Sequence, residues 1–128
     1  MVSRTLIAGV PQSGKTTYAL KEFPESIITH TDDLLATVTV WSERSEKIVE
    51  LMDKERQFCI EGCDAVRGLR KFMVRNPGKK PVDHVIWFGA PKVELSNKQA
   101  AFGRGCKKIF DELMPDLHTL GVLVTIES

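Results

Sequence analysis

The sequence predicts a three-layer α/β sandwich built around a mostly parallel, five-stranded sheet. Short apolar runs alternate with longer amphipathic stretches along the whole chain, a pattern typical of strands joined by helices. No repeat or low-complexity segment interrupts this alternation. The length of 128 residues is that of one domain, so we expect residues 1–128 to fold as a single unit.

The predicted strands are five short apolar runs bounded by turn-forming or polar residues. They cover residues 5–8, 26–29, 58–60, 82–88 and 122–126. Five strands leave little room for insertions in a chain of this length.

The predicted helices lie between these runs. Their first three segments are residues 16–22, residues 42–56 and the stretch after Asp64. Asp64 is the expected N-cap of the third helix, whose apolar residues recur at helical spacing. A last helix is expected within residues 96–114, most clearly from Cys106 onward.

Composition limits the class of protein. Hydrophobic residues make up 42% of the chain, charged residues 27%, and the net charge is +1, so a disordered chain is excluded. No apolar run approaches the ~18 residues of a membrane span, and no signal peptide is evident. The three cysteines form no disulfide framework, and Cys59 and Cys63 lack further ligands for zinc. These features indicate a cytoplasmic protein.

The charge is unevenly distributed. All 11 basic residues of the second half lie between Arg67 and Lys108, where Asp83 and Glu94 are the only acids. This block therefore has a formal charge of +9 (11 minus 2). Such a block could meet a polyanion, although solvated helix faces are the favoured explanation of the block taken alone.

One motif indicates phosphate chemistry. Residues 9–16 read G-V-P-Q-S-G-K-T, which fits G-x-x-x-x-G-K-[ST] in full. A predicted strand precedes it and a predicted helix follows, as the motif requires. In such a loop, backbone N–H groups and a helix N-terminus surround a phosphate. An inconsequential Gly-Pro turn is the alternative.

Each residue type in the motif has a physical reason. Gly14 lets the backbone approach the phosphate, Lys15 reaches the β and γ oxygens, and the Thr16 hydroxyl binds Mg²⁺. The residues expected to bind the nucleotide are Gly9, Pro11, Gln12, Ser13, Gly14, Lys15, Thr16 and Thr17.

Acidic residues follow two of the predicted strands. In a parallel sheet, ligands bind beyond the carboxyl ends of strands. Asp32 could accept the proton of an attacking hydroxyl, while Asp33 and Glu61 could join Thr16 around Mg²⁺. The alternatives are that one aspartate caps the next helix and that Glu61 faces solvent.

Two arginines are further catalytic candidates. Arg67 lies one turn from Arg70 and could bind an anionic substrate, or both could lie on a solvated face. Arg104 stands between Gly103 and Gly105. A hinged segment there could move this arginine onto the transferring phosphoryl group as a lid, or the glycines could serve helix packing.

The first 35 residues resemble the small P-loop kinases. The motif, the short helix ending near Phe23-Pro24 and the T-D-D-L segment are most similar to the kinase module of phage-type polynucleotide kinases. They are more loosely similar to zeta-toxin-like and shikimate-type kinases. The resemblance implies ATP and Mg²⁺ as cofactors and Asp32 as general base for a hydroxyl. Here Leu34 and Leu35 follow the aspartates, where polynucleotide kinases have a basic residue, so the acceptor is left open.

The leading hypothesis is therefore a Mg-ATP-dependent phosphotransferase acting on a hydroxyl or phosphate acceptor, such as a nucleotide or polynucleotide. A nucleotide-binding ATPase or switch acting through a partner is the alternative from a different class. A nucleic-acid-binding protein that carries the loop incidentally ranks third. A guanine-specific GTPase is disfavoured because no N/T-K-x-D motif is present.

Overall fold

The structure, a computed structural model, describes residues 3–36 and 41–127. Its strands are β1 (Arg4–Gly9), β2 (Ile28–His30), β3 (Phe58–Glu61), β4 (His84–Phe88) and β5 (Leu123–Glu127). Its helices are α1 (Lys15–Glu22), α2 (Trp41–Lys54), α3 (Ala65–Arg75) and α4 (Asn97–Thr119), with short 3₁₀ helices η1 (Glu25–Ile27) and η2 (Thr31–Ala36).

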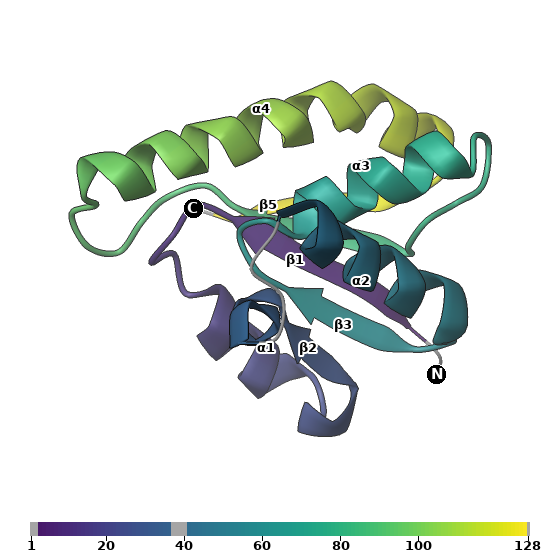
Figure 1. The fold of residues 1–128 in the computed structure, drawn as a ribbon, viewed down its shortest axis with the longest axis horizontal. Coiled ribbons are helices and arrows are strands. Elements are labelled where there is room, and N and C mark those ends of the chain that lie inside the picture. Colours follow the sequence, from purple (N-terminus) through teal and green to yellow (C-terminus); the bar gives the residue numbers. More distant parts are fainter. Residues whose placement is uncertain (1–2, 37–40, 128) are drawn as a thin grey trace.

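The strands form one parallel sheet in the order β2-β3-β1-β4-β5 (Figure 1). The central strand β1 therefore has β3 on one side and β4 on the other. Parallel strands end at the same edge of a sheet, so the segments that follow β1, β2, β3 and β4 gather there. The predicted α/β class and five-stranded sheet are confirmed.

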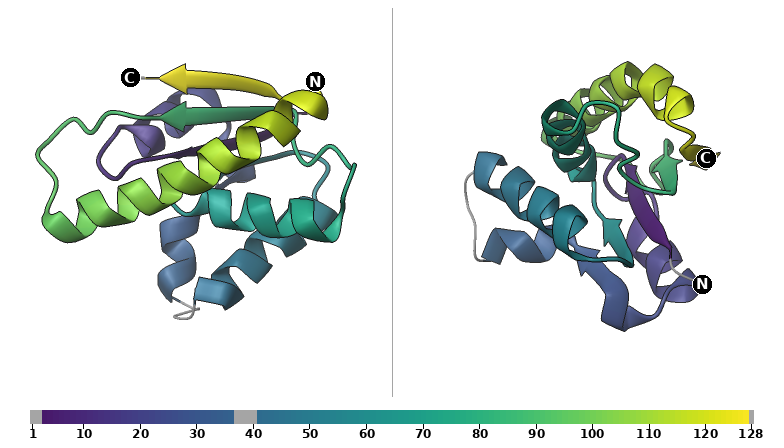
Figure 2. Two further views of the ribbon diagram at one scale, coloured as in Figure 1. Left: turned by 90° about the horizontal axis from the view of Figure 1, so that it is seen from above. Right: turned by 90° about the vertical axis from the view of Figure 1, so that its right-hand side faces the viewer.

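Alternation of side chains along β1 creates two cores. Leu6 and Ala8 are buried in the larger core with residues of α2, α3 and α4, whereas Ile7 packs with Ala19 of α1 on the opposite face. Figure 2 shows α1 on one side of the sheet and the other three helices on the other. The predicted three-layer arrangement is thereby confirmed.

The second strand differs from the prediction. Residues 26–29 were expected to be extended, yet Ser26 and Ile27 belong to η1 and the strand begins at Ile28. Pro24 initiates the turn, and its carbonyl accepts a hydrogen bond from Ile27 N at 3.1 Å. The local turn chemistry of proline outweighs the strand preference of the isoleucines here.

Helix α4 is longer than predicted. It begins at a capping box in which Ser96 and Gln99 exchange hydrogen bonds, and it continues through Pro115 to Thr119. Its inward face buries six residues along its length: Gly103, Cys106, Ile109, Phe110, Leu113 and Leu117. Phe110 stacks on Trp87 with ring centroids 4.7 Å apart. This packing outweighs the hydrogen bond lost at the proline. No helix in the described part of the chain is both long and apolar enough to cross a membrane.

An ion-pair cluster joins α2 to α3. Arg75 Nη2 donates to Glu46 Oε2 at 2.7 Å, and Lys71 Nζ lies 3.1 Å from the same oxygen. Hydrogen bonds from Arg75 and Lys71 lower the pKa of the Glu46 carboxyl to about 2. The cluster also uses basic side chains from the block between Arg67 and Lys108.

Candidate functional site

The loop between β1 and α1 has the conformation that a phosphate requires. Gly14 has a φ of +92° and forms the N-cap of α1 without a side-chain capping bond. The N–H groups of the first turn therefore remain available to an anion. Gly9 is also required, because a Cβ there would lie 2.2 Å from the carbonyl oxygen of Phe88.

Lys15 is folded back over this loop. Its side chain is only 6% exposed, and its Nζ donates to the carbonyl oxygen of Val10 at 2.7 Å and to Ser13 Oγ at 3.2 Å. Ser13 Oγ in turn donates to the same Val10 carbonyl at 2.8 Å. The ammonium group is thus held at the loop, where it can exchange these neutral acceptors for phosphate oxygens.

Glu61 lies beside the loop. Thr16 Oγ1 donates to Glu61 Oε1 at 3.0 Å, and the ring of His30 contacts that oxygen through Nδ1 at 2.6 Å. Glu61 is 4% exposed, so the alternative of a solvent-facing strand-end acid is wrong. The strand order explains the contact, because β3 is the immediate neighbour of β1.

A cavity of about 610 Å³ opens over the phosphate loop. It brings most of the predicted nucleotide-binding and acidic residues together. From the predicted set, the lining includes Pro11, Gln12, Ser13, Gly14, Lys15, Thr16, Thr17, Asp32 and Glu61. The other lining residues are Arg44, Cys63, Asp64, Lys92, Val93, Gln99 and Phe102.

The two adjacent aspartates are placed differently. Both side chains are exposed, but Asp32 lines the cavity and Asp33 is not part of its lining. Both lie in η2, which follows β2 directly. Asp32 therefore shares a cavity with the phosphate loop, whereas the role predicted for Asp33 as a metal ligand stays a prediction.

The oxygens of Thr16 and Glu61 suit Mg²⁺, which prefers hard oxygen ligands. Within residues 3–36 and 41–127, no three His, Cys, Asp or Glu side chains gather so as to hold a metal by themselves. A cation at Thr16 and Glu61 would therefore complete its shell with phosphate oxygens and water, as Mg²⁺ commonly does. The residues present fit a cation that arrives with a nucleotide.

Arg44 and Asp64 form a buried ion pair in the cavity wall. Arg44 Nη1 lies 3.2 Å from Asp64 Oδ2, and the side chains are 3% and 4% exposed. Asp64 does occupy the N-cap position of α3, but its side chain makes no capping bond. The predicted N-cap position is therefore confirmed, but the carboxylate is directed to the arginine and not to the first N–H groups of α3.

Cys63 also lines the cavity, beside Lys15. Burial raises the pKa of its thiol, and the neighbouring Lys15 opposes that effect. Cys59 and Cys106 are fully buried, and burial raises the pKa of their thiols to about 12 and about 11. Cys63 is thus the thiol that a reagent entering the cavity would meet.

The segment after β4 contributes a cation that sequence reasoning missed. Lys92 lines the cavity, and its backbone N–H donates to the carbonyl oxygen of Gln12 at 2.7 Å. A Cβ on Gly14 would lie 2.7 Å from Lys92 Cε, so the lysine side chain crosses the phosphate loop. Only the pairing of β4 with β1 brings this segment there.

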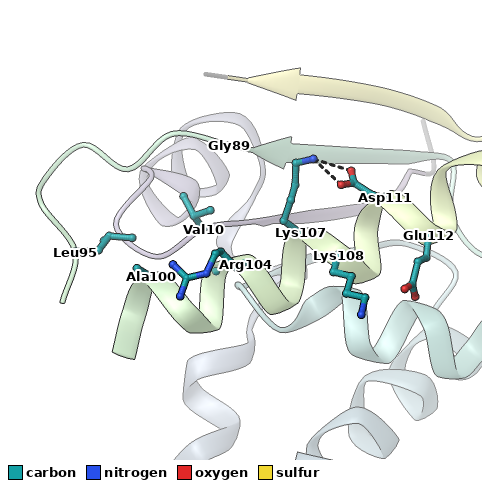
Figure 3. Close-up of a pocket in the computed structure, with 10 residues that line it drawn as sticks. Val10, Gly89, Leu95, Ala100, Arg104, Lys107, Lys108, Asp111 and Glu112 are labelled. Carbon is teal, nitrogen blue, oxygen red and sulfur yellow. Dashed lines mark hydrogen bonds and ion pairs between the residues drawn. The ribbon is translucent and has the colours of Figure 1, made fainter. Parts of the chain in front are cut away.

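The two arginines predicted to be catalytic are not part of the lining of the phosphate cavity. Arg104 lines a second cavity, of about 630 Å³, with Val10, Leu95 and Lys108 among its other walls (Figure 3). Arg67 lies beside α4, with Nη2 4.0 Å from the point a Cβ of Gly105 would occupy. Neither arginine lines the phosphate cavity.

The hinge predicted around Arg104 is also absent from this structure. Residues 97–119 form one continuous helix. Gly103 is buried, and a Cβ there would lie 3.3 Å from Val10 Cγ1 and from Pro11 Cδ. The glycine therefore allows α4 to pack closely on the phosphate loop, which was the alternative explanation for it.

Comparison with known proteins supports the architecture. The chain is similar in structure to shikimate kinase from Acinetobacter baumannii in complex with shikimate, with a TM-score of 0.61. The match covers 100% of this chain and 84% of that chain, at 16% sequence identity. No protein-family model matches the chain, and no curated protein does. The chain therefore shares its overall fold with that kinase, and its phosphate-loop motif lies between β1 and α1.

Proposed function

We propose that the protein is a Mg-ATP-dependent phosphotransferase that moves the γ-phosphoryl group to an acceptor hydroxyl. One observation carries the proposal: the phosphate loop, the Thr16–Glu61 pair and Asp32 all line one cavity. A nucleotide switch needs the loop and a cation site. It does not need a second carboxylate in the same cavity, which here comes from η2.

The chemistry follows from these placements. The loop amides and Lys15 bind the β- and γ-phosphates. Mg²⁺, when bound with the nucleotide, neutralises charge on the phosphate oxygens. Asp32 accepts the proton of the acceptor hydroxyl as its oxygen bonds to the γ-phosphorus. The bond to the β–γ bridging oxygen breaks, and ADP leaves. Lys92, whose side chain crosses the loop at Gly14, offsets charge on the transferring group.

An acceptor with an anionic group is consistent with the lining of the cavity. The Arg44 guanidinium lines it and has a geometry that matches phosphate and carboxylate, but such a group would have to compete with Asp64, the present partner of Arg44. Nucleotides and 5′-hydroxyl polynucleotides are acceptors of this kind. Phe102 lines the same cavity and offers an aromatic surface.

A nucleic-acid-binding function without transfer has less support. At least four of the 11 basic residues between Arg67 and Lys108 are engaged in ion pairs: Lys71, Arg75, Lys80 and Lys107. Glu46 and Asp111, which lie outside the block, therefore offset part of its formal charge of +9, whereas Asp83, the partner of Lys80, is already counted in that value. This leaves the block as a secondary aid to acceptor binding.

The test is to follow the label from γ-labelled ATP in the presence of Mg²⁺. Separate reactions would contain 5′-hydroxyl oligonucleotides, nucleosides, nucleoside monophosphates and a small-molecule cell extract. We expect label on an acceptor from one of these pools. Label found only as free phosphate, or left on ATP in every pool, would contradict transfer and favour an ATPase or switch.

A pair of adjacent variants tests the base. Asp32→Asn should lower the transfer rate by about 10²–10⁴-fold while ATP affinity is retained. Asp33→Asn is the matched control, since that side chain lies outside the cavity lining, and it should transfer at a near-normal rate. Equal rates for the two variants would exclude Asp32 as the base.

A further inference from the structure

His30 belongs to the phosphate site, although neither the motif nor the fold requires a histidine there. It is the last residue of β2 and lies opposite Glu61 in the register of the β2–β3 ladder. Its Nδ1 lies 2.6 Å from Glu61 Oε1. The side chain is 23% exposed, whereas that of Glu61 is 4% exposed.

Two partners therefore hold one carboxylate oxygen. Thr16 Oγ1 reaches Glu61 Oε1 from α1 at 3.0 Å, and His30 reaches the same oxygen from β2 at 2.6 Å. A carboxylate held by one donor can rotate about its terminal bond, since that torsion is broad. A second donor from a different element fixes its plane. An ionised Glu61 also requires that the proton be on Nδ1 of His30.

We propose that His30 is a positioning residue for the divalent cation, acting by fixing Glu61 beside Thr16. The inference rests on the proposed function, because the cation arrives with the nucleotide. His30 is not part of the cavity lining, so it acts through Glu61 rather than on the phosphates. Outer ligands of this kind typically change metal affinity by about 10- to 100-fold when they are removed.

The experiment measures the affinity for a fluorescent ATP analogue in excess Mg²⁺ and, separately, in EDTA. His30→Leu keeps the side-chain bulk and removes the donor. We expect the affinity in Mg²⁺ to fall by about 10- to 100-fold, with the affinity in EDTA unchanged. Direct titration with Mn²⁺ in the presence of the nucleotide should show the same loss, independently of any turnover.

Matched variants separate positioning from a general structural effect. His30→Asn places an amide N–H near Nδ1 and should retain most of the Mg²⁺-dependent affinity, whereas His30→Gln places it farther out and should not. His84→Leu removes a different imidazole hydrogen bond, to Thr125 Oγ1 at 2.7 Å, away from the cavity, and should change neither affinity. If His30→Leu fails to fold, the comparison of the Mg²⁺-dependent nucleotide affinities of His30→Asn and His30→Gln still tests the positioning role.

Three results would overturn the inference. His30→Leu could bind the Mg²⁺ complex as tightly as the wild type, or lose affinity equally in EDTA, or the Asn and Gln variants could behave alike. Failure of the proposed function is distinguishable from these. A wild-type protein that binds no nucleotide would remove both proposals, whereas one that binds with Mg²⁺ dependence but transfers no phosphate would leave this inference standing.

Discussion

Replacement of Gly14 by alanine tests the phosphate loop directly, and the chain provides its own control. Gly14 has a φ of +92°, and Gly78 has a φ of +83° in the loop after α3. A left-handed conformation costs an L-residue about 1–2 kcal/mol. Both variants should therefore lose about 1–2 kcal/mol of unfolding free energy unless the backbone relaxes.

The two sites differ in what surrounds them. Nothing lies within 4 Å of a Cβ built on Gly78, whereas a Cβ on Gly14 would lie 2.7 Å from Lys92 Cε. In Gly14→Ala the lysine side chain must move. If the loop relaxes from the left-handed conformation, restoring that conformation on phosphate binding costs free energy. A binding cost of about 1–2 kcal/mol corresponds to about 5- to 30-fold weaker nucleotide affinity.

The assay pairs urea unfolding with calorimetric titration by Mg-ATP. Gly78→Ala should lose stability and keep the wild-type affinity. Gly14→Ala should lose affinity relative to Gly78→Ala at comparable stability. If Gly14→Ala binds Mg-ATP as tightly as Gly78→Ala does, the left-handed glycine is not needed for phosphate binding and the reasoning is refuted.

Three further predictions concern other parts of the molecule. Lys92→Ala should lower the rate of phosphoryl transfer from ATP by about 100-fold. Arg104→Ala should leave that rate near normal, because the Arg104 side chain lines the second cavity. A larger loss of rate in Arg104→Ala than in Lys92→Ala, measured by steady-state kinetics, would contradict the role given to Lys92. Hydrogen bonds from two basic side chains of α3 lower the pKa of Glu46 from 4.5 to about 2, so its stabilising effect is present above about pH 4.5 and is lost as the pH falls through about 2. Acid-unfolding curves of the wild type and Glu46→Gln should therefore differ above this window and converge below it, and parallel curves would contradict the pairing. Maleimide at pH 8 should modify Cys63 before the other two thiols, and Mg-ATP should slow that reaction; equal rates with and without nucleotide, measured by peptide mass spectrometry, would place Cys63 outside the nucleotide site.

The parts of the fold that the sequence predicted well are those encoded locally. The apolar runs in β1, β3 and β4 are buried on both faces of the parallel sheet, and a short continuous apolar run of this kind predicts a strand. The phosphate loop is determined by glycines and a lysine within eight residues, and its conformation agrees with the motif. The boundary of β2 was missed because proline starts a turn just before two β-branched residues.

The parts that could not be predicted depend on strand order. Lys92 reaches the loop because β4 pairs with β1, and His30 meets Glu61 because β2 pairs with β3. Arg44 and Asp64 are 20 positions apart and meet only when α2 packs on the start of α3. Gly103 and Gly105 of α4 suggested a hinge because glycine has a weak helix propensity, yet the helix is continuous and Gly103 packs against Val10 and Pro11.

The most direct test of this account is a crystal structure of the protein with Mg²⁺ and a non-hydrolysable ATP analogue. We expect the β- and γ-phosphates within the loop of residues 9–16, the cation between Thr16 and Glu61, and the Asp32 carboxylate facing the γ-phosphate. Phosphates bound away from the loop, or a γ-phosphate that Asp32 does not approach, would contradict the proposed phosphotransfer site.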